Sequence, residues 1–273
     1  MYTLLFYFLI LFSCFASRVP IFCEILSSGT CESLQDFIKK FNPKLLHILD
    51  YNEKEEEKVF LVRGNIPIVG GKFCYDLLKK KIQDVIIQSG FSIRDNFKIV
   101  DVSLLGYSAE EQNFLQIEKD WFHHNPETGL FIHKPILGIS TNLLSIEPSF
   151  HKLFANTNID GLRELIYTLK ELMYISLYPY EDTVIYIHCT AGKDRTGEVS
   201  AAYLMQNKNL SYIQATELNN QIAGRDVYTK QANAICLYAL YLRNIKNCSW
   251  IGSILEDTST VNLYDNKLSL IHI

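Results

Sequence analysis

This 273-residue sequence has no excess of positive charge: 26 Lys and Arg residues are outnumbered by 30 Asp and Glu residues, which gives a formal net charge of −4. It also lacks a basic stripe interleaved with aromatic residues, a pattern typical of nucleic-acid-binding proteins. The local charge runs, KEEEK at 54–58 and KKK at 79–81, are typical of solvated surface. We therefore expect no nucleic-acid partner.

Internal repeats, low-complexity blocks and Pro- or Ser-rich linkers are missing as well. Apolar residues make up 48% of the chain and charged residues 21%, which is ordinary for a protein with a buried core. A chain of this length can hold one large domain or two small ones. Because no linker divides it, the sequence favours a single domain over 24–250, followed by a C-terminal extension over 251–273.

No apolar run reaches the roughly 20 residues that a membrane-spanning helix needs. The run LLFYFLILF at 4–12 has the length of a signal-peptide core, and Cys14 and Ala16 suit positions −3 and −1 of a cleavage site. We expect residues 1–16 to be a signal peptide, no stable membrane span after its removal, and a secreted or secretory-lumen protein. Because the segment begins Met-Tyr-Thr without Lys or Arg, three alternatives stay open: an uncleaved anchor, a buried N-terminal segment and a cytoplasmic protein.

The cysteines are too few, and their number is odd, for a complete disulfide framework. Of the seven cysteines, Cys14 would leave with the signal peptide and Cys189 is a candidate nucleophile. Five remain, so any pairing among them is partial.

Strands alternate with helices along the chain, and the last part is entirely helical. Strands are predicted at 59–64, 84–89, 97–105, 130–137 and 183–188. Helices are predicted at 30–41, 73–82, 108–122, 160–177, 196–207, 211–224 and 229–246. Ser108 and Glu111 suit a capping box, and Asp160 suits an N-cap. This order predicts an α/β fold with a mainly parallel central sheet of four or five strands, flanked by helices and followed by a C-terminal helical cluster.

The stretch VIYIHCTAGKDRTG at 184–197 carries the chemistry. A buried strand runs into a Gly-containing turn and then a helix, so unpaired N–H groups of the turn and the helix start point at one spot. Arg195 offers two parallel donors to an oxyanion held there. The same positive surroundings would lower the pKa of Cys189, and a thiolate facing a bound phosphate can attack phosphorus. Gly192 lets the backbone approach the ligand.

The ten residues HCTAGKDRTG resemble the signature loop of the cysteine-dependent protein tyrosine and dual-specificity phosphatases. They are most similar to the subgroup with Gly-Lys-Asp-Arg-Thr-Gly, found in bacterial secreted tyrosine and lipid phosphatases and their relatives. Beyond these ten residues the resemblance lies only in the order of strands and helices, which is phosphatase-like.

The resemblance implies a two-step reaction without a metal or other cofactor. Cys189 would attack the phosphate to form a phosphocysteine, which water would hydrolyse, and Arg195 would stabilise the transition state. His188 would support the loop and the thiolate through hydrogen bonds, and Thr196 would donate to the sulfur. The substrate-binding residues would be Thr190, Ala191, Gly192, Lys193, Thr196 and Gly197.

The acid that protonates the leaving oxygen is less certain from the sequence. In the broad family it is an Asp in a loop before the last strand. Here that loop, 138–159, has a single acidic residue, Glu147. The Lys-Asp-Arg subgroup points instead to the Asp inside the signature loop, which is Asp194 here. Our order of preference is Asp194, then Asp160, then Glu147.

The expected substrate is a phosphorylated protein, chiefly through phosphotyrosine, with phosphoserine, phosphothreonine or a phosphoinositide as further possibilities. Lys193 either favours substrates with more than one phosphate or points to solvent. The alternatives are a secreted, phytase-like inositol polyphosphate phosphatase and a non-catalytic protein that binds phosphorylated partners. No metal site is expected, since His123, His124, His133 and Asp120 do not have ligand spacing.

Overall fold

The structure is a computed structural model of the chain, and it describes residues 41–54, 56–140, 147–157 and 161–254. The expected signal peptide at 1–16, nearly all of the helix predicted at 30–41, and Asp160 lie outside the described residues.

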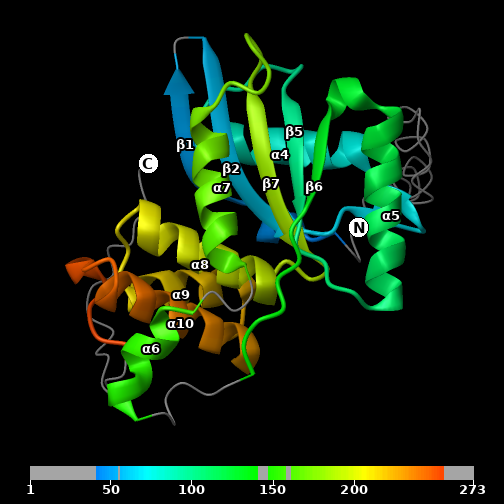
Figure 1. Cartoon of the computed structure of the whole chain (residues 1–273). Coiled ribbons are helices and arrows are strands. Elements are labelled where there is room, and N and C mark those ends of the chain that lie inside the picture. The colour runs from blue at the N-terminus through cyan, green and yellow to red at the C-terminus, as the bar shows by residue number, and fades with distance from the viewer. Residues whose placement is uncertain (1–40, 55, 141–146, 158–160, 255–273) are drawn as a thin grey trace, which may run out of the picture.

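A five-stranded sheet lies at the centre of the molecule, with its strands in the order β1-β2-β7-β5-β6 (Figure 1). The strands are β1 (His47–Lys54), β2 (Glu57–Asn65), β5 (Lys98–Ser103), β6 (Gly129–His133) and β7 (Thr183–Cys189). Only the edge strand β1 is antiparallel to its neighbour, while β2, β7, β5 and β6 are parallel. The prediction of a mainly parallel sheet is therefore confirmed.

Helices cover both faces of this sheet, and each face has its own apolar core. On one face, α4 (Tyr75–Gln88) and α5 (Ala109–His124) pack over Phe60, Val62 and Tyr186. On the other face, α7 (Leu162–Tyr174) and α8 (Asp194–Asn207) pack over Leu61, Ile185 and Ile187. Because alternate residues of a strand point to opposite faces, β7 is buried on both sides, as its continuous apolar run predicts.

The predicted C-terminal helical cluster is present. It contains α8, α9 (Tyr212–Ala223) and α10 (Thr229–Asn244), with α6 (His151–Ala155) against α10 (Figure 1). Its packed residues continue through Ile251 to Ile254. The smaller elements are η1 (Pro43–Leu45), β3 (Ile68–Val69), β4 (Lys72–Phe73), η2 (Pro126–Thr128), η4 (Pro148–Phe150) and η5 (Ser249–Ile251). In the described part of the chain, no helix has the length and apolar character needed to cross a membrane.

Two local predictions were wrong, and one strand was missed. Residues 84–89, predicted as a strand, belong almost entirely to α4, which buries Leu78, Ile82 and Ile86 at helical spacing. Strand β1 was not predicted, since it ends in charged residues and lies at the edge of the sheet. The segment 138–159, predicted as a loop, includes η4 and α6.

Candidate active site

The signature loop begins where β7 ends, at the edge of the sheet where parallel strands finish. Ligands of open α/β sheets bind at this edge. Main-chain bonds fix the end of β7: Ile66 N donates to Cys189 O at 3.0 Å, and Leu104 N donates to His188 O at 2.9 Å. The chain turns through residues 190–193 and enters α8 at Asp194. Cys189, only 2% exposed, therefore lies between two neighbouring strands and a helix N-terminus.

Gly192 is required by the close packing of this turn against β2. Its φ is +65°, and a Cβ at this position would lie 2.5 Å from the Gly64 carbonyl oxygen. Its own carbonyl accepts a hydrogen bond from Arg63 Nη2 at 2.8 Å. With the carbonyl held in this way, the Gly192 N–H donates to the Cys189 sulfur.

The surroundings of Cys189 favour its thiolate. Burial alone would raise the pKa of this thiol, but the charge of Arg195, the Thr196 hydroxyl and the N–H groups of Thr196 and Gly192 together lower it below its ordinary value. Thr196 is fully buried at the start of α8. The structure thus brings together Cys189, Gly192, Arg195 and Thr196, as the sequence predicted.

Arg195 is held at the mouth of the loop by Glu111 of α5. Arg195 Nη1 donates to Glu111 Oε2 at 3.1 Å, and Nη2 donates to Oε1. The Glu111 carboxylate also accepts from Thr190 Oγ1 at 2.8 Å and from Gly106 N at 2.8 Å. Burial would raise the pKa of Glu111, but its bonds to Arg195 and Thr190 lower it. The guanidinium is thereby oriented before any phosphate binds.

The capping box predicted for α5 is half wrong. Ser108 Oγ accepts from Glu111 N at 3.3 Å, as expected of an N-cap. The Glu111 side chain, however, binds Gly106 N, Thr190 and Arg195. A charge-assisted pair with an arginine is stronger than a bond to a neutral N–H, so the carboxylate turns to the loop.

Asp194 is the first residue of α8, and Arg225 holds it in a two-pronged ion pair. Arg225 Nη1 and Nη2 donate to its two oxygens at 2.9 and 2.7 Å, and Tyr228 N donates to Oδ1 at 2.9 Å. Burial would raise the pKa of Asp194, but these bonds and the charge of Arg225 lower it below its ordinary value. In this arrangement both oxygens of an ionised carboxylate are engaged.

The other residues predicted around the site differ in exposure. Ala191 is exposed at the tip of the turn, and the half-buried Lys193 is the N-cap of α8. Glu147 is exposed just before η4, and within the described ranges no hydrogen bond or ion pair joins its side chain to the loop. Gly197 is buried, and a Cβ there would lie 3.2 Å from Val227 Cγ1, so α8 packs closely at this point.

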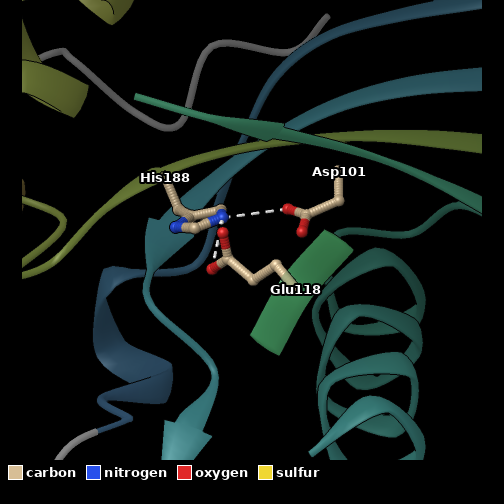
Figure 2. Close-up of side chains that lie close together, drawn as sticks. All are labelled: Asp101, Glu118 and His188. Carbon is tan, nitrogen blue, oxygen red and sulfur yellow. Dashed lines mark ion pairs between the residues drawn. The ribbon is translucent and has the colours of Figure 1, made fainter. Parts of the chain in front are cut away.

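His188 points to the opposite face of β7 from Cys189, into a fully buried cluster with Asp101 of β5 and Glu118 of α5 (Figure 2). Its Nε2 lies 2.9 Å from Asp101 Oδ1 and 3.4 Å from Glu118 Oε1. Burial would lower the pKa of His188, but the two carboxyl groups raise it to about 9. Burial and the Asp101 charge raise the pKa of Glu118, which His188 only partly offsets. Near neutral pH, His188 therefore carries a proton and Glu118 remains protonated.

Among the residues that the structure describes, this cluster is the one group with the composition and spacing to hold a metal ion. One ligand atom from each residue lies within 4.8 Å of the others. The raised pKa values of His188 and Glu118 favour an imidazolium beside a protonated Glu118, which limits the charge buried in the cluster. His124 and His133, considered in the sequence, instead bond to the carbonyl oxygens of Asp120 and Leu105.

Sequence reasoning missed Arg63, Asp101, Glu118 and Asn219. Arg63 and Asp101 stand inside otherwise apolar strands, VFLVRG and KIVDVS, and a charged residue in such a run is a signal of a buried charge. Glu118 and Asn219 stand in amphipathic helices among other polar residues, where nothing distinguishes them.

No protein-family model matches the sequence, and a comparison with curated proteins finds no match. Solved structures of phosphatases do align with it. Tk-PTP in its active form is 19% identical over 67% of this chain and 92% of its own, with a TM-score of 0.36. Kinase associated phosphatase is 16% identical over 75% of this chain and 97% of its own, with a TM-score of 0.39. The PP-IP phosphatase SIW14 from S. cerevisiae is 15% identical over 72% of this chain and 88% of its own, with a TM-score of 0.35. At such values, conclusions on function depend on the residues of the site itself.

The buried cluster predicts how stability depends on pH. Folded His188 keeps its proton up to about pH 9, whereas in the unfolded chain it loses it near its ordinary pKa of 6.5. Unfolding between these values releases a proton, so the free energy of unfolding should fall as pH rises through this window, and the raised pKa of Glu118 acts in the same direction. Glu118→Gln should make this fall less steep in urea unfolding between pH 6 and 9. The exposed Glu110→Gln is the control; equal slopes for the wild type and both variants would contradict the raised pKa of Glu118 and its effect on His188.

Glu111→Gln should impair Arg195 without unfolding the protein. A hydrogen bond to a charged group contributes about 1.5–3 kcal/mol, so kcat/KM toward an aryl phosphate should fall roughly tenfold to a hundredfold. Steady-state kinetics would measure this, with Glu110→Gln again as the control on the same helix. A value of kcat/KM within twofold of the wild type would show that Arg195 does not depend on Glu111.

Proposed function

We propose that this chain is a metal-independent phosphatase that hydrolyses phosphomonoesters through a phosphocysteine intermediate. The observation that carries the proposal is that Cys189 and Arg195 lie together at the mouth of the signature loop. The buried thiol has a pKa lowered by Arg195 and hydrogen-bond donors, and the guanidinium is oriented by Glu111. A thiolate beside donors arranged for an oxyanion is the arrangement that nucleophilic attack on phosphorus needs.

In the first step, the Cys189 sulfur forms a bond to phosphorus while the bond to the leaving oxygen breaks. Arg195 and the loop N–H groups bind the non-bridging phosphate oxygens, whose charge they stabilise. In the second step, water attacks the phosphocysteine, the S–P bond breaks and inorganic phosphate leaves. The Thr196 hydroxyl and the N–H groups of Gly192 and Thr196 then stabilise the thiolate that departs.

We propose phosphotyrosine as the main substrate because, among the described residues, the site has no acidic side chain that is free to donate a proton to the leaving oxygen. Asp194 is held as a carboxylate, so it can give a proton to the leaving oxygen only after it is released from Arg225 and Tyr228 N and has itself taken up a proton. A phenolate, with an ordinary pKa near 10, departs with less help than an alkoxide does. Phosphoserine, phosphothreonine and phosphoinositide activity would require that release, or an acid from Asp160 or Glu147.

The second candidate function is hydrolysis of phosphoinositides or soluble inositol polyphosphates. It is favoured by Lys193, an additional cation inside the loop at the N-cap of α8. A third hypothesis, binding of phosphorylated proteins without turnover, is disfavoured because Cys189 and Arg195 are both present and oriented. A secreted or lumenal location stays a proposal based on residues 1–16.

The first test is turnover of an aryl phosphate by the protein from residue 17 onward, with EDTA present throughout. Cys189→Ser should abolish turnover, since an alcohol is not ionised at neutral pH, while inorganic phosphate should still bind because Arg195 and the loop N–H groups remain. Calorimetry measures the binding, and Cys236→Ser, which changes another buried free thiol, is the matched control. If Cys189→Ser turned over substrate near the wild-type rate, Cys189 would not be the nucleophile. An inactive wild type would favour the hypothesis that the protein binds phosphorylated partners without turnover.

The second test concerns the acid. Since Asp194 is ionised and fully engaged by Arg225, we expect Asp194→Asn to lower kcat/KM for aryl and alkyl phosphates by a similar factor. A matched pair of substrates with the same phosphate and different leaving groups measures this ratio. A loss at least tenfold larger on the alkyl phosphate would instead establish Asp194 as the proton donor, the first preference from the sequence.

A further inference from the structure

Arg63 is a charged residue sealed inside the protein next to the signature loop. It lies on β2 with an exposed fraction of 0%, and it is among the largest fully buried side chains of the described residues. Strand β2 is the parallel neighbour of β7, with Arg63 opposite Ile187 and Asn65 opposite Cys189. Since residues two apart share a face, Arg63 is on the same face of the sheet as Cys189.

Its hydrogen bonds join both ends of the loop. Arg63 Nη2 donates to Gly192 O at 2.8 Å, inside the turn. Arg63 Nη1 donates to Asn219 Oδ1 of α9, and Asn219 Nδ2 donates to Gly197 O in the first turn of α8. Asn219 is only 1% exposed. One guanidinium therefore ties β2, the turn, α8 and α9 into one rigid support for the loop.

In the part of the chain that the structure describes, no carboxylate forms an ion pair with Arg63. Burial lowers its pKa to about 10, which still leaves it protonated at neutral pH, and the opposing influence comes from Cys189. A buried charge without a counter-ion is strongly destabilising, so an anion at Cys189 is the group that can balance it.

We propose that Arg63 is a positioning residue for the reaction, which holds the Gly192 carbonyl away from the phosphate and balances the anion at Cys189 from within the protein. The proposal rests on the proposed function, because it takes the Cys189 thiolate as the nucleophile. Arg63 differs from Arg195 in exposure: Arg195 is 19% exposed and open to substrate, whereas Arg63 is sealed behind the loop. Its charge is thus present in every step, whichever phosphate occupies the site.

Other charged and titratable groups also act on this anion, so the experiment must separate Arg63 from them. The groups whose charge couples to Cys189 are Arg63, Arg195, Arg225, His188 and Tyr186. His47 of β1, opposite Arg63, is a further titratable neighbour whose pKa is lowered, chiefly by burial and also by the Arg63 charge. Substituting Arg63 leaves the other groups in place, although removing its charge also relieves its lowering of the His47 pKa.

The test is the pH dependence of Cys189 alkylation in the full chain. Iodoacetamide reacts with the thiolate, and mass spectrometry of the peptide containing Cys189 separates it from other cysteines. Arg63→Met, which removes the charge, should raise the midpoint by about one pH unit, a roughly tenfold smaller thiolate fraction below it. Arg63→Lys should keep the midpoint near the wild type, yet weaken inhibition by inorganic phosphate about tenfold, because the single ammonium nitrogen of lysine does not reproduce the two fixed guanidinium nitrogens that bond Gly192 O and Asn219 Oδ1. Arg94→Met removes a charge beside Asp182, at the end of β7 opposite Cys189, and should change neither the midpoint nor the inhibition by phosphate.

The outcomes separate the inference from the proposed function. A wild-type midpoint near that of an ordinary thiol would overturn the proposed function itself. A low wild-type midpoint that Arg63→Met leaves unchanged, in a protein with native circular dichroism, would overturn the role of Arg63. If Arg63→Met does not fold, Arg63→Lys decides: weaker phosphate inhibition with an unchanged midpoint supports the role, whereas unchanged inhibition or a midpoint raised by a full unit overturns it.

Discussion

A sulfur anion at Cys189 would lie at the carboxyl end of a strand buried on both faces, where the side chain is 2% exposed and water cannot balance its charge. The protein must supply that balance from fixed groups. N–H groups at the turn and the start of α8, the Thr196 hydroxyl and Arg195 do so from the side of the loop. Much of the surrounding structure follows from this one requirement, because each of these groups needs its own support.

The alternation of side chains along β7 keeps two charged clusters apart. Cys189 faces the loop, α8 and Arg63, whereas His188 faces Asp101 and Glu118 on the other side of the sheet. On the His188 side, protonation of both His188 and Glu118 limits the charge buried away from solvent. On the Cys189 side, the charge of Arg195, the Thr196 hydroxyl and the N–H groups of Thr196 and Gly192 favour an anion at the sulfur.

The residues that could be predicted from the sequence are those whose chemistry is local. The loop from His188 to Gly197 is contiguous, and the strands with continuous apolar runs identify a parallel sheet. Glu111 is 84 residues from Arg195 in the chain, and Arg63 is 129 residues from Gly192. Nothing in the local pattern pairs them, because only the strand order β2-β7-β5 brings them together. The error at 84–89 has a different cause: the apolar run VII suits a strand or a helix, and burial of Leu78, Ile82 and Ile86 decided it.

Exposure divides the three arginines around the loop into different tasks. Arg63 is sealed and bonded to carbonyl and amide oxygens, so its position does not depend on substrate. Arg195 is partly exposed, and the Glu111 carboxylate holds its guanidinium in place at the mouth of the loop. Arg225, whose side chain is 32% exposed, donates both of its terminal nitrogens to the Asp194 carboxylate, so the two charges offset each other at the start of α8. Of the three, Arg195 is the arginine whose charge lowers the pKa of Cys189 most, while Arg63 acts on the sulfur from inside the protein.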